Sequence, residues 1–311
     1  MTDNTVFDSV FKTIVKKSPQ LVVPLINEVF DRNYAPETTV EMFNSEHQSM
    51  RGTIIADSVF RLQDKLYHVE CQSTADSAMV VRMIEYDFAI ALEEALATGA
   101  PYRMEFPSSC VLFLRHTDST PDVLEMEVLL PDGSSFTYET KVVKAQRFTK
   151  EDIFARRLLL LLPFYLMRYE KELEHIANDD AGTDKLVAEC AELRGKLEAA
   201  TLAAGETLLY EELTELIIRV ADHLTETYGA LRKKVRMAMG GEVLELMRDR
   251  AERLEREAEV RGIEQGIEQG IEQGIEQGAS EMSSLLRERG IDPALLEEVE
   301  ALVKGASRKG V

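Results

Sequence analysis

Residues 57–73 read DSVFRLQDKLYHVECQS, and this stretch decides the fold that the sequence predicts. Strand-forming residues fill 52–62 and 66–73, on either side of the polar link Gln63-Asp64-Lys65. Runs of β-branched and aromatic residues that are separated by a short polar link are typical of a β-hairpin. We therefore predict two adjacent antiparallel strands in the first half of the chain.

The segments around this hairpin predict an α/β fold. Apolar residues recur at helical spacing before and after it, and short apolar runs between turn residues indicate further strands. A helix followed by strands, a helix and a further strand predicts a mixed sheet flanked by helices. The predicted helices are one that opens at 8–11 and breaks at 18–19, and two more at 21–30 and 78–97. The predicted strands are at 110–114, 123–130 and 135–143. After residue 153 the chain is predicted to be almost wholly helical.

The length of 311 residues leaves room for about two domains of roughly 100–200 residues each. The polar run Asn178-Asp179-Asp180-Ala181-Gly182 is the best linker between an α/β front part and a helical rear part. A repeat with a period of four residues, GIEQ, follows further along the chain. We predict an α/β domain over 1–175, a helical domain over 176–261, the repeat as a helix or spacer over 262–278, and a helical tail over 279–311.

Hydropathy and cysteine usage bear on the compartment. The longest apolar run, 158–167, is about half as long as a bilayer span and contains Pro163, so we predict no membrane segment. The first residues hold acids and no uninterrupted apolar core, unlike a secretory signal. Cys71, Cys110 and Cys190 form no CxxC pair, which suits a reducing compartment and offers no zinc site. These features predict a cytoplasmic protein.

The net charge is −20, from 36 Lys and Arg against 56 Asp and Glu. Affinity for nucleic-acid phosphates rests on Lys and Arg, so this balance counts against tight non-specific binding of DNA. The same balance is compatible with an enzyme whose acidic residues surround metal ions.

The predicted hairpin brings acidic residues together. Side chains alternate across a strand, so His68, Glu70 and Gln72 share one face, and the hairpin folds Asp57 back towards the level of Glu70. Two carboxylates on adjacent strands can share Mg²⁺, with Mn²⁺ as a substitute, and the ion lowers the pKa of a bound water for phosphodiester hydrolysis. Gln72 would orient that water. The alternative is that both acids lie on the solvent-facing side of a half-exposed sheet.

Four segments of the chain resemble the Rpn family, which comprises recombination-promoting nucleases and transposase-like proteins. They are DSVFK at 8–12, DSVFRL at 57–62, HVECQS at 68–73 and RMIEY at 82–86, in the order and spacing of that family. In addition, LLPFYLMRY at 161–169 is similar to the end of the family's nuclease domain, and the GIEQ tail is similar to its Gly-repeat tails. The resemblance covers roughly residues 5–170.

The resemblance implies a restriction-endonuclease-like core of the PD-(D/E)XK type and Mg²⁺-dependent DNA cleavage linked to recombination or mobile DNA. Asp57 and Glu70 would then be metal ligands, and Asp8 would be a helix-borne acid near the metal. Gln72 would stand where the wider superfamily has lysine. A neutral amide in place of a cation beside the transition state is expected to slow the reaction by roughly 10²–10³.

Arg82, Tyr86 and Lys12 are the candidate contacts for DNA phosphates. Arg82 and Tyr86 are spaced to share one helix face, where Arg82 would hold a phosphate or orient Glu70. The alternative is an Arg side chain packed along a half-buried Tyr. Lys12 lies one turn from Asp8, so it forms either an ion pair within the helix or a phosphate contact.

The GIEQ repeat places Gly at every fourth position from 262 to 278, beside a stripe of Ile. Small residues allow a second helix to approach closely, with the Ile side chains filling the seam. Each interior Gly costs roughly 1 kcal/mol relative to Ala, so a lone helix would be marginal. We therefore expect a homo-oligomer that forms through the C-terminal helices; the alternative is a largely unfolded spacer.

The leading hypothesis is a Mg²⁺-dependent DNA endonuclease whose nuclease domain occupies 1–175 and which acts as a homo-oligomer. The competing hypothesis is a catalytically weak or inactive nuclease-fold protein that serves as an oligomeric interaction module. No GxxxxGK[ST], GxGxxG, GxSxG or HExxH motif is present, so several other enzyme classes lose their usual signatures. The predicted partners are DNA and a second copy of the chain, with no membrane.

Overall fold

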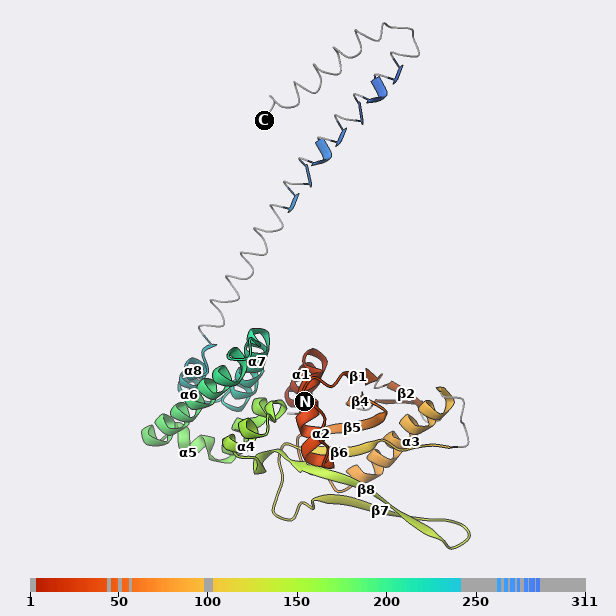
Figure 1. The fold of residues 1–311 in the computed structure, drawn as a ribbon. Coiled ribbons are helices and arrows are strands. Elements are labelled where there is room, and N and C mark those ends of the chain that lie inside the picture. The colour runs from red at the N-terminus through yellow and green to blue at the C-terminus, as the bar shows by residue number, and fades with distance from the viewer. Residues whose placement is uncertain are drawn as a thin grey trace. The chain divides into compact units, whose positions relative to one another are not determined.

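The structure of the chain is a computed structural model (Figure 1). It describes residues 4–43, 46–49, 52–55, 58–97 and 103–241, and in the C-terminal part residues 262–263, 266–267, 269–271, 273–274, 277–278, 280–282 and 284–285. The chain divides into two compact units, Met1–Leu244 and Glu245–Val311, which are described separately below.

The first unit contains, among the residues described, a mixed sheet of six strands (Figure 1). In order across the sheet, the strands are β1 (Val40–Phe43), β4 (Ser58–Leu62), β5 (Lys65–Gln72), β6 (Ser108–Phe113), β8 (Ser135–Lys144) and β7 (Val123–Leu129). β4 is antiparallel to β1 and β5, whereas β5, β6 and β8 are parallel and β7 is antiparallel to β8. The predicted α/β class with a mixed sheet flanked by helices is confirmed.

The predicted hairpin is formed by β4 and β5, with Ser58 opposite Val69 and Leu62 opposite Lys65. The turn holds only Gln63 and Asp64, because Lys65 already pairs as part of β5. Gln63 has a positive φ of 55°, as tight hairpin turns require. The polar link is therefore one residue shorter than the sequence predicted.

The predicted strand over 52–62 is wrong in its first part. Gly52–Ile55 forms β3, which pairs with β2 (Glu46–Ser49) in a separate two-stranded sheet. Extended backbone needs hydrogen-bond partners, and β3 finds them in a preceding segment instead of in β5. That segment reads EHQS and has no apolar alternation, so its pairing could not be predicted.

Helices cover the two faces of the sheet. On one face, α1 (Asn4–Lys17) and α2 (Val22–Phe30) share an apolar cluster with β5 that includes Phe11 and Val69. On the other, α3 (Met79–Ala97) shares a cluster with β6 that includes Met83 and Val111. Because side chains alternate along a strand, β5 directs Tyr67, Val69 and Cys71 to the α1 face and His68, Glu70 and Gln72 to the α3 face.

The predicted hairpin around residues 131–133 is present as β7 and β8, and the first unit is helical from there on. Leu159–Glu172 (η3) forms consecutive 3-10 turns around Pro163, whose nitrogen has no hydrogen to donate within an α-helix. Residues 159–167 are all buried, so this segment closes the core as predicted. The remaining helices are η1 (Pro19–Leu21), η2 (Ala145–Arg147), α4 (Lys150–Ala155), α5 (Leu173–Ala177), α6 (Asp180–Leu202), α7 (Thr207–Leu224) and α8 (Gly229–Ala238).

α7 packs against α1 from far along the chain. Ser18 Oγ donates to Glu212 Oε2 at 2.9 Å across 194 residues of sequence, and Arg219 Nη2 donates to Ser9 Oγ at 3.1 Å. One apolar cluster accordingly extends from α1 to the end of α8. The expected boundary between 175 and 176 lies inside the unit Met1–Leu244, and the independent folding of 1–175 and of 176–261 stays a prediction.

The described residues of 262–285 in the second unit are helical. Ile263, Ile267 and Ile271 are 56%, 58% and 59% exposed. The neighbouring glycines have nothing within 4 Å of the position that a Cβ would take. The stripe of isoleucines and the adjacent stripe of glycines are thus both exposed on this helix. Ile275 lies outside the described residues.

Among the described helices, none is both long and apolar enough to cross a membrane. Cys71, Cys110 and Cys190 are buried and unbridged. Burial raises the pKa of the Cys110 and Cys190 thiols to about 12. These two thiols are therefore unreactive at neutral pH.

Candidate functional site

The structure places two of the predicted catalytic residues, Glu70 and Gln72, near the end of β5 on the α3 face. Glu70 is buried and Gln72 is half-buried. Asp57, the second expected carboxylate, lies outside the described residues; the described part of β4 begins with Ser58, opposite Val69. The pairing of Asp57 with Glu70 stays a prediction.

The carboxylate of Glu70 is held between two nitrogen-bearing side chains. Its side chain is 2% exposed. Oε1 accepts a hydrogen bond from Arg82 Nη2 at 3.3 Å, and Oε2 lies 3.4 Å from His68 Nε2. Arg82 comes from the first turn of α3, and His68 comes from the same face of β5. Glu70 is thus oriented through both of its oxygens.

His68 continues this network away from Glu70. Its Nδ1 lies 2.8 Å from Asp87 Oδ1, and Asp87 Oδ2 accepts a 2.6 Å hydrogen bond from Tyr138 OH. All three residues are buried between the sheet and α3. Sequence reasoning assigned these residues no role because the partners are 19 and 51 residues apart; the shared strand face of His68 and Glu70 was the only available signal.

The charge of His68 follows from its partners. Burial alone would lower the pKa of the imidazole, but the hydrogen bonds and charges of Asp87 and Glu70 outweigh burial and raise it to about 9. His68 is therefore an imidazolium at neutral pH, and it donates from both ring nitrogens. Burial, with the Asp87 charge adding to it, also raises the pKa of Tyr138, which stays protonated as a donor.

Arg82 and Tyr86 lie together on α3, as their spacing predicted. Arg82 Nε and Nη2 lie 3.4 and 3.2 Å from Tyr86 OH, and the guanidinium carbon is 5.7 Å from the ring centroid. The Arg82 side chain is 43% exposed. Both interpretations from the sequence therefore describe part of its position: it orients Glu70, and it packs along Tyr86. Its contact with a phosphate stays a prediction.

Asp8 and Lys12 form the ion pair within α1 that their spacing allowed, with Lys12 Nζ 3.1 Å from Asp8 Oδ2. Both side chains are partly exposed. α1 covers the face of the sheet opposite to the one that carries Glu70. The roles of Asp8 near a metal and of Lys12 at a phosphate stay predictions.

The donors on β5 fit a hard cation by type. Glu70 offers a carboxylate and Gln72 an amide oxygen, and Mg²⁺ prefers oxygen ligands. Cationic groups already contact both oxygens of Glu70; the exposed Arg82 side chain has solvent to move into, whereas His68 is enclosed. Within the described ranges, no group of three or more His, Cys, Asp and Glu side chains could hold a metal ion. The second carboxylate that the sequence predicts for a metal site here, Asp57, lies outside these ranges.

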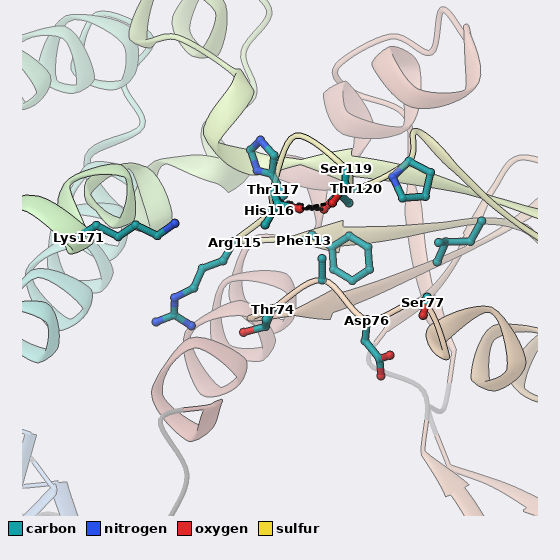
Figure 2. A pocket seen from close by; sticks show the side chains of 13 residues that line it. Thr74, Asp76, Ser77, Phe113, Arg115, His116, Thr117, Ser119, Thr120 and Lys171 are labelled. Carbon is teal, nitrogen blue, oxygen red and sulfur yellow. Dashed lines mark hydrogen bonds between the residues drawn. The ribbon is translucent and has the colours of Figure 1, made fainter.

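A cleft of about 400 Å³ opens where β5 and β6 leave the sheet (Figure 2). The strands stay paired up to this edge, because Leu114 N donates to Gln72 O at 2.9 Å and Arg115 N donates to Ser73 O at 3.1 Å. Its walls include the loops that follow these two strands. The carboxyl ends of adjacent parallel strands are where open α/β sheets bind ligands. Thr74, which lines the cleft, is only two residues beyond Gln72.

The basic side chains of Arg115 and Lys171 line this cleft. Arg115 is held by Glu170 through two hydrogen bonds of 2.6 Å, and Figure 2 shows Lys171 extending towards the cleft from η3. Burial, together with nearby Arg147 and Lys144, lowers the pKa of His116. The Nδ1 atom of His116 is buried without a hydrogen-bond partner among the residues described. Sequence reasoning missed this cleft, although its residues directly follow two predicted strands.

Comparisons of the chain with protein-family models, with curated proteins and with solved structures find no significant match. The resemblance to the Rpn family therefore depends on the quoted segments alone.

Proposed function

We propose that the chain is a Mg²⁺-dependent DNA endonuclease of the PD-(D/E)XK type that acts at the end of the β4–β5 hairpin. The observation that carries the proposal is the position of Glu70. A carboxylate buried in a sheet costs free energy unless partners compensate for it. Glu70 has such partners in Arg82 and His68, and together they orient both of its oxygens.

The metal would be held by Glu70 and Asp57, with the amide of Gln72 beside them. When bound, Mg²⁺ would polarise the phosphodiester and lower the pKa of the water molecule that serves as the nucleophile. Gln72 shares the strand face of Glu70 and orients that water. Arg82 moves from Glu70 to a phosphate oxygen, which is a suitable ligand for a guanidinium.

The cleft beyond Gln72 supports DNA as the substrate. The cleft opens at the end of β5 that carries Gln72, and Lys171 and hydroxyl-bearing loops line it. Lys and hydroxyl side chains commonly bind the sugar-phosphate backbone. With a net charge of −20 for the chain, such local contacts must supply the affinity for DNA.

A second candidate function is an oligomeric interaction module without catalysis. The exposed Ile263, Ile267 and Ile271 favour it, because an apolar helical stripe is typical of association with another helix. The two functions differ in one measurable property: only the first makes DNA cleavage depend on Glu70 and on a divalent cation.

The deciding experiment is plasmid nicking by the purified full chain in Mg²⁺ and in EDTA. Glu70→Gln and Asp57→Ala are expected to lose cleavage. Glu189→Gln is the matched control: like Glu70, this carboxylate accepts a hydrogen bond from a cation, Lys150 Nζ, and its other oxygen accepts one from Tyr165 OH, but it lies on α6. It should cleave like the wild type. Cleavage by Glu70→Gln at the wild-type rate, or cleavage in EDTA, would overturn the proposal. A wild type that never cleaves DNA would also overturn it and would favour the interaction module.

A further inference from the structure

Arg82 and His68, which both contact Glu70, differ in how readily they could move away from its carboxylate. Arg82, at Oε1, is 43% exposed and reaches the carboxylate from a long side chain that has solvent beside it. His68, at Oε2, is 0% exposed, and its other nitrogen is held by Asp87. Arg82 can therefore leave without a change in the packed interior, whereas His68 cannot.

The position of His68 is itself fixed from three elements. The residue belongs to β5, Asp87 is on α3, and Tyr138 on β8 donates to the second oxygen of Asp87 at 2.6 Å. Tyr86 lies edge-on to the imidazole, with 5.9 Å between the ring centroids. Apolar residues such as Met83 and Ile90 on α3 are buried along the same helix. These neighbours hold the imidazole in one orientation, with Nε2 directed at Glu70.

Stability alone does not account for this arrangement. A buried set of ionic groups is often no more stabilising than apolar side chains of similar volume. Its distinct effect is geometric: with Oε2 fixed by His68, the other oxygen of Glu70 keeps its direction when Arg82 moves away.

We propose that His68, held by Asp87 and Tyr138, is a positioning residue that anchors Glu70 Oε2 and presents Oε1 as the metal ligand, with Arg82 as the replaceable occupant of the ligand position. This inference rests on the proposed function. Groups that orient metal ligands from behind typically change metal affinity by roughly 10–100-fold when they are removed. The two neighbours of one carboxylate should therefore act in opposite directions on metal binding.

The test is the affinity of the full chain for Mn²⁺, measured without DNA by the loss of the free-ion signal in electron paramagnetic resonance. His68→Leu should weaken binding by roughly 10–100-fold. His68→Gln, whose amide can still donate to Glu70, should recover part of that loss. Arg82→Gln should strengthen binding, because it removes a cation that competes for Oε1. Thr201→Val is the control, since it removes a buried hydrogen bond, to Leu197 O, on α6.

The outcomes separate this inference from the proposed function. If the wild type binds Mn²⁺ and the His68 and Arg82 variants bind it equally well, only the positioning role is overturned. Weaker binding by Arg82→Gln would also overturn it, because the guanidinium would then assist the metal. If the wild type binds no Mn²⁺, both proposals fall. Should His68→Leu not fold, as judged by circular dichroism, His68→Gln and Arg82→Gln still give the opposed comparison.

Discussion

Arg115 and Glu170 form a paired hydrogen bond in which both N···O distances are 2.6 Å, and so join the end of β6 to η3. The guanidinium carbon of Arg115 also lies 4.9 Å from the centre of the Phe7 ring on α1. This one side chain therefore connects the sheet edge, the first helix and the 3-10 segment that carries Lys171.

Glu170→Gln is expected to lower the free energy of unfolding by about 1 kcal/mol, because it removes the charge from a two-fold, mostly buried hydrogen-bonded pair. Urea denaturation followed by circular dichroism measures the change. Glu105→Gln is the matched control, since the Glu105 side chain is 67% exposed in its pair with Lys65 and should show no measurable effect. An equal loss of unfolding free energy in both variants would mean that the Arg115–Glu170 pair stabilises the fold no more than an exposed ion pair does.

Stability should depend on pH through His68. Its pKa in the folded chain, about 9, lies above the ordinary value of 6.5. The stabilisation is therefore complete below about pH 6.5 and is lost as the pH rises through about 9, at up to about 1.4 kcal/mol per pH unit. Urea denaturation in EDTA at several pH values across this window should show the decline, and His68→Gln should remove it. A wild-type stability that stays constant across the window would contradict the charged imidazole.

Gln72 is the third test, since it would stand where the wider PD-(D/E)XK superfamily has lysine. Gln72→Lys should retain cleavage or increase it, because a cation stabilises the charge that develops on the phosphate. Gln72→Leu should lower the rate by roughly 10²–10³, the usual cost of losing one oriented donor. Single-turnover plasmid nicking measures both. The same rate in all three proteins would place residue 72 outside the site.

Lys171 tests the cleft. If it contacts a phosphate, Lys171→Gln should weaken DNA binding for every sequence and reduce the slope of log affinity against log salt by about 1. Fluorescence anisotropy in EDTA measures binding without cleavage. Lys196→Gln, a lysine on α6 that neighbours Glu192, is the control and should leave the slope unchanged. An unchanged slope for Lys171→Gln would mean that Lys171 in the cleft does not contact DNA.

Removal of residues 262–311 should lower the oligomeric state measured by light scattering. The five glycines of the repeat forfeit roughly 5 kcal/mol relative to alanine. Burial of the Ile side chains on a second chain returns about 1.5–3 kcal/mol each. The first unit should remain folded and keep its Mn²⁺ affinity. An unchanged mass in solution would mean that the repeat is a spacer.

Local sequence patterns were sufficient for much of the fold. The polar residues Gln63 and Asp64 between two apolar runs predicted the β4–β5 turn, and the absence of Gly and Pro over 78–97 predicted α3. β2 escaped prediction because Glu46–Ser49 is polar throughout, and it is a strand only because β3 pairs with it. The polar run at 178–182, predicted as a linker, holds a helix cap in which Asp179 accepts from Gly182 N at 2.8 Å.

The candidate site divides in the same way. Alternation along β5 was sufficient to put His68, Glu70 and Gln72 on one face, and helical spacing was sufficient to pair Arg82 with Tyr86. The contacts of His68 with Asp87, and of Asp87 with Tyr138, depend on how α3 and β8 pack on β5. The spacing of residues within a single strand or helix cannot predict these contacts between elements.

The contact of α7 with α1 has a consequence for synthesis on the ribosome. Ser18 meets Glu212, and Phe7 meets His223 with 5.3 Å between the ring centroids, so α1 is covered by a helix that is synthesised long after it. At roughly 5–20 residues per second, the nascent chain grows for about 10–40 s before α7 has been made. During that interval the apolar side of α1 that α7 will cover stays open, which makes the growing chain a candidate client for chaperones that bind nascent polypeptides.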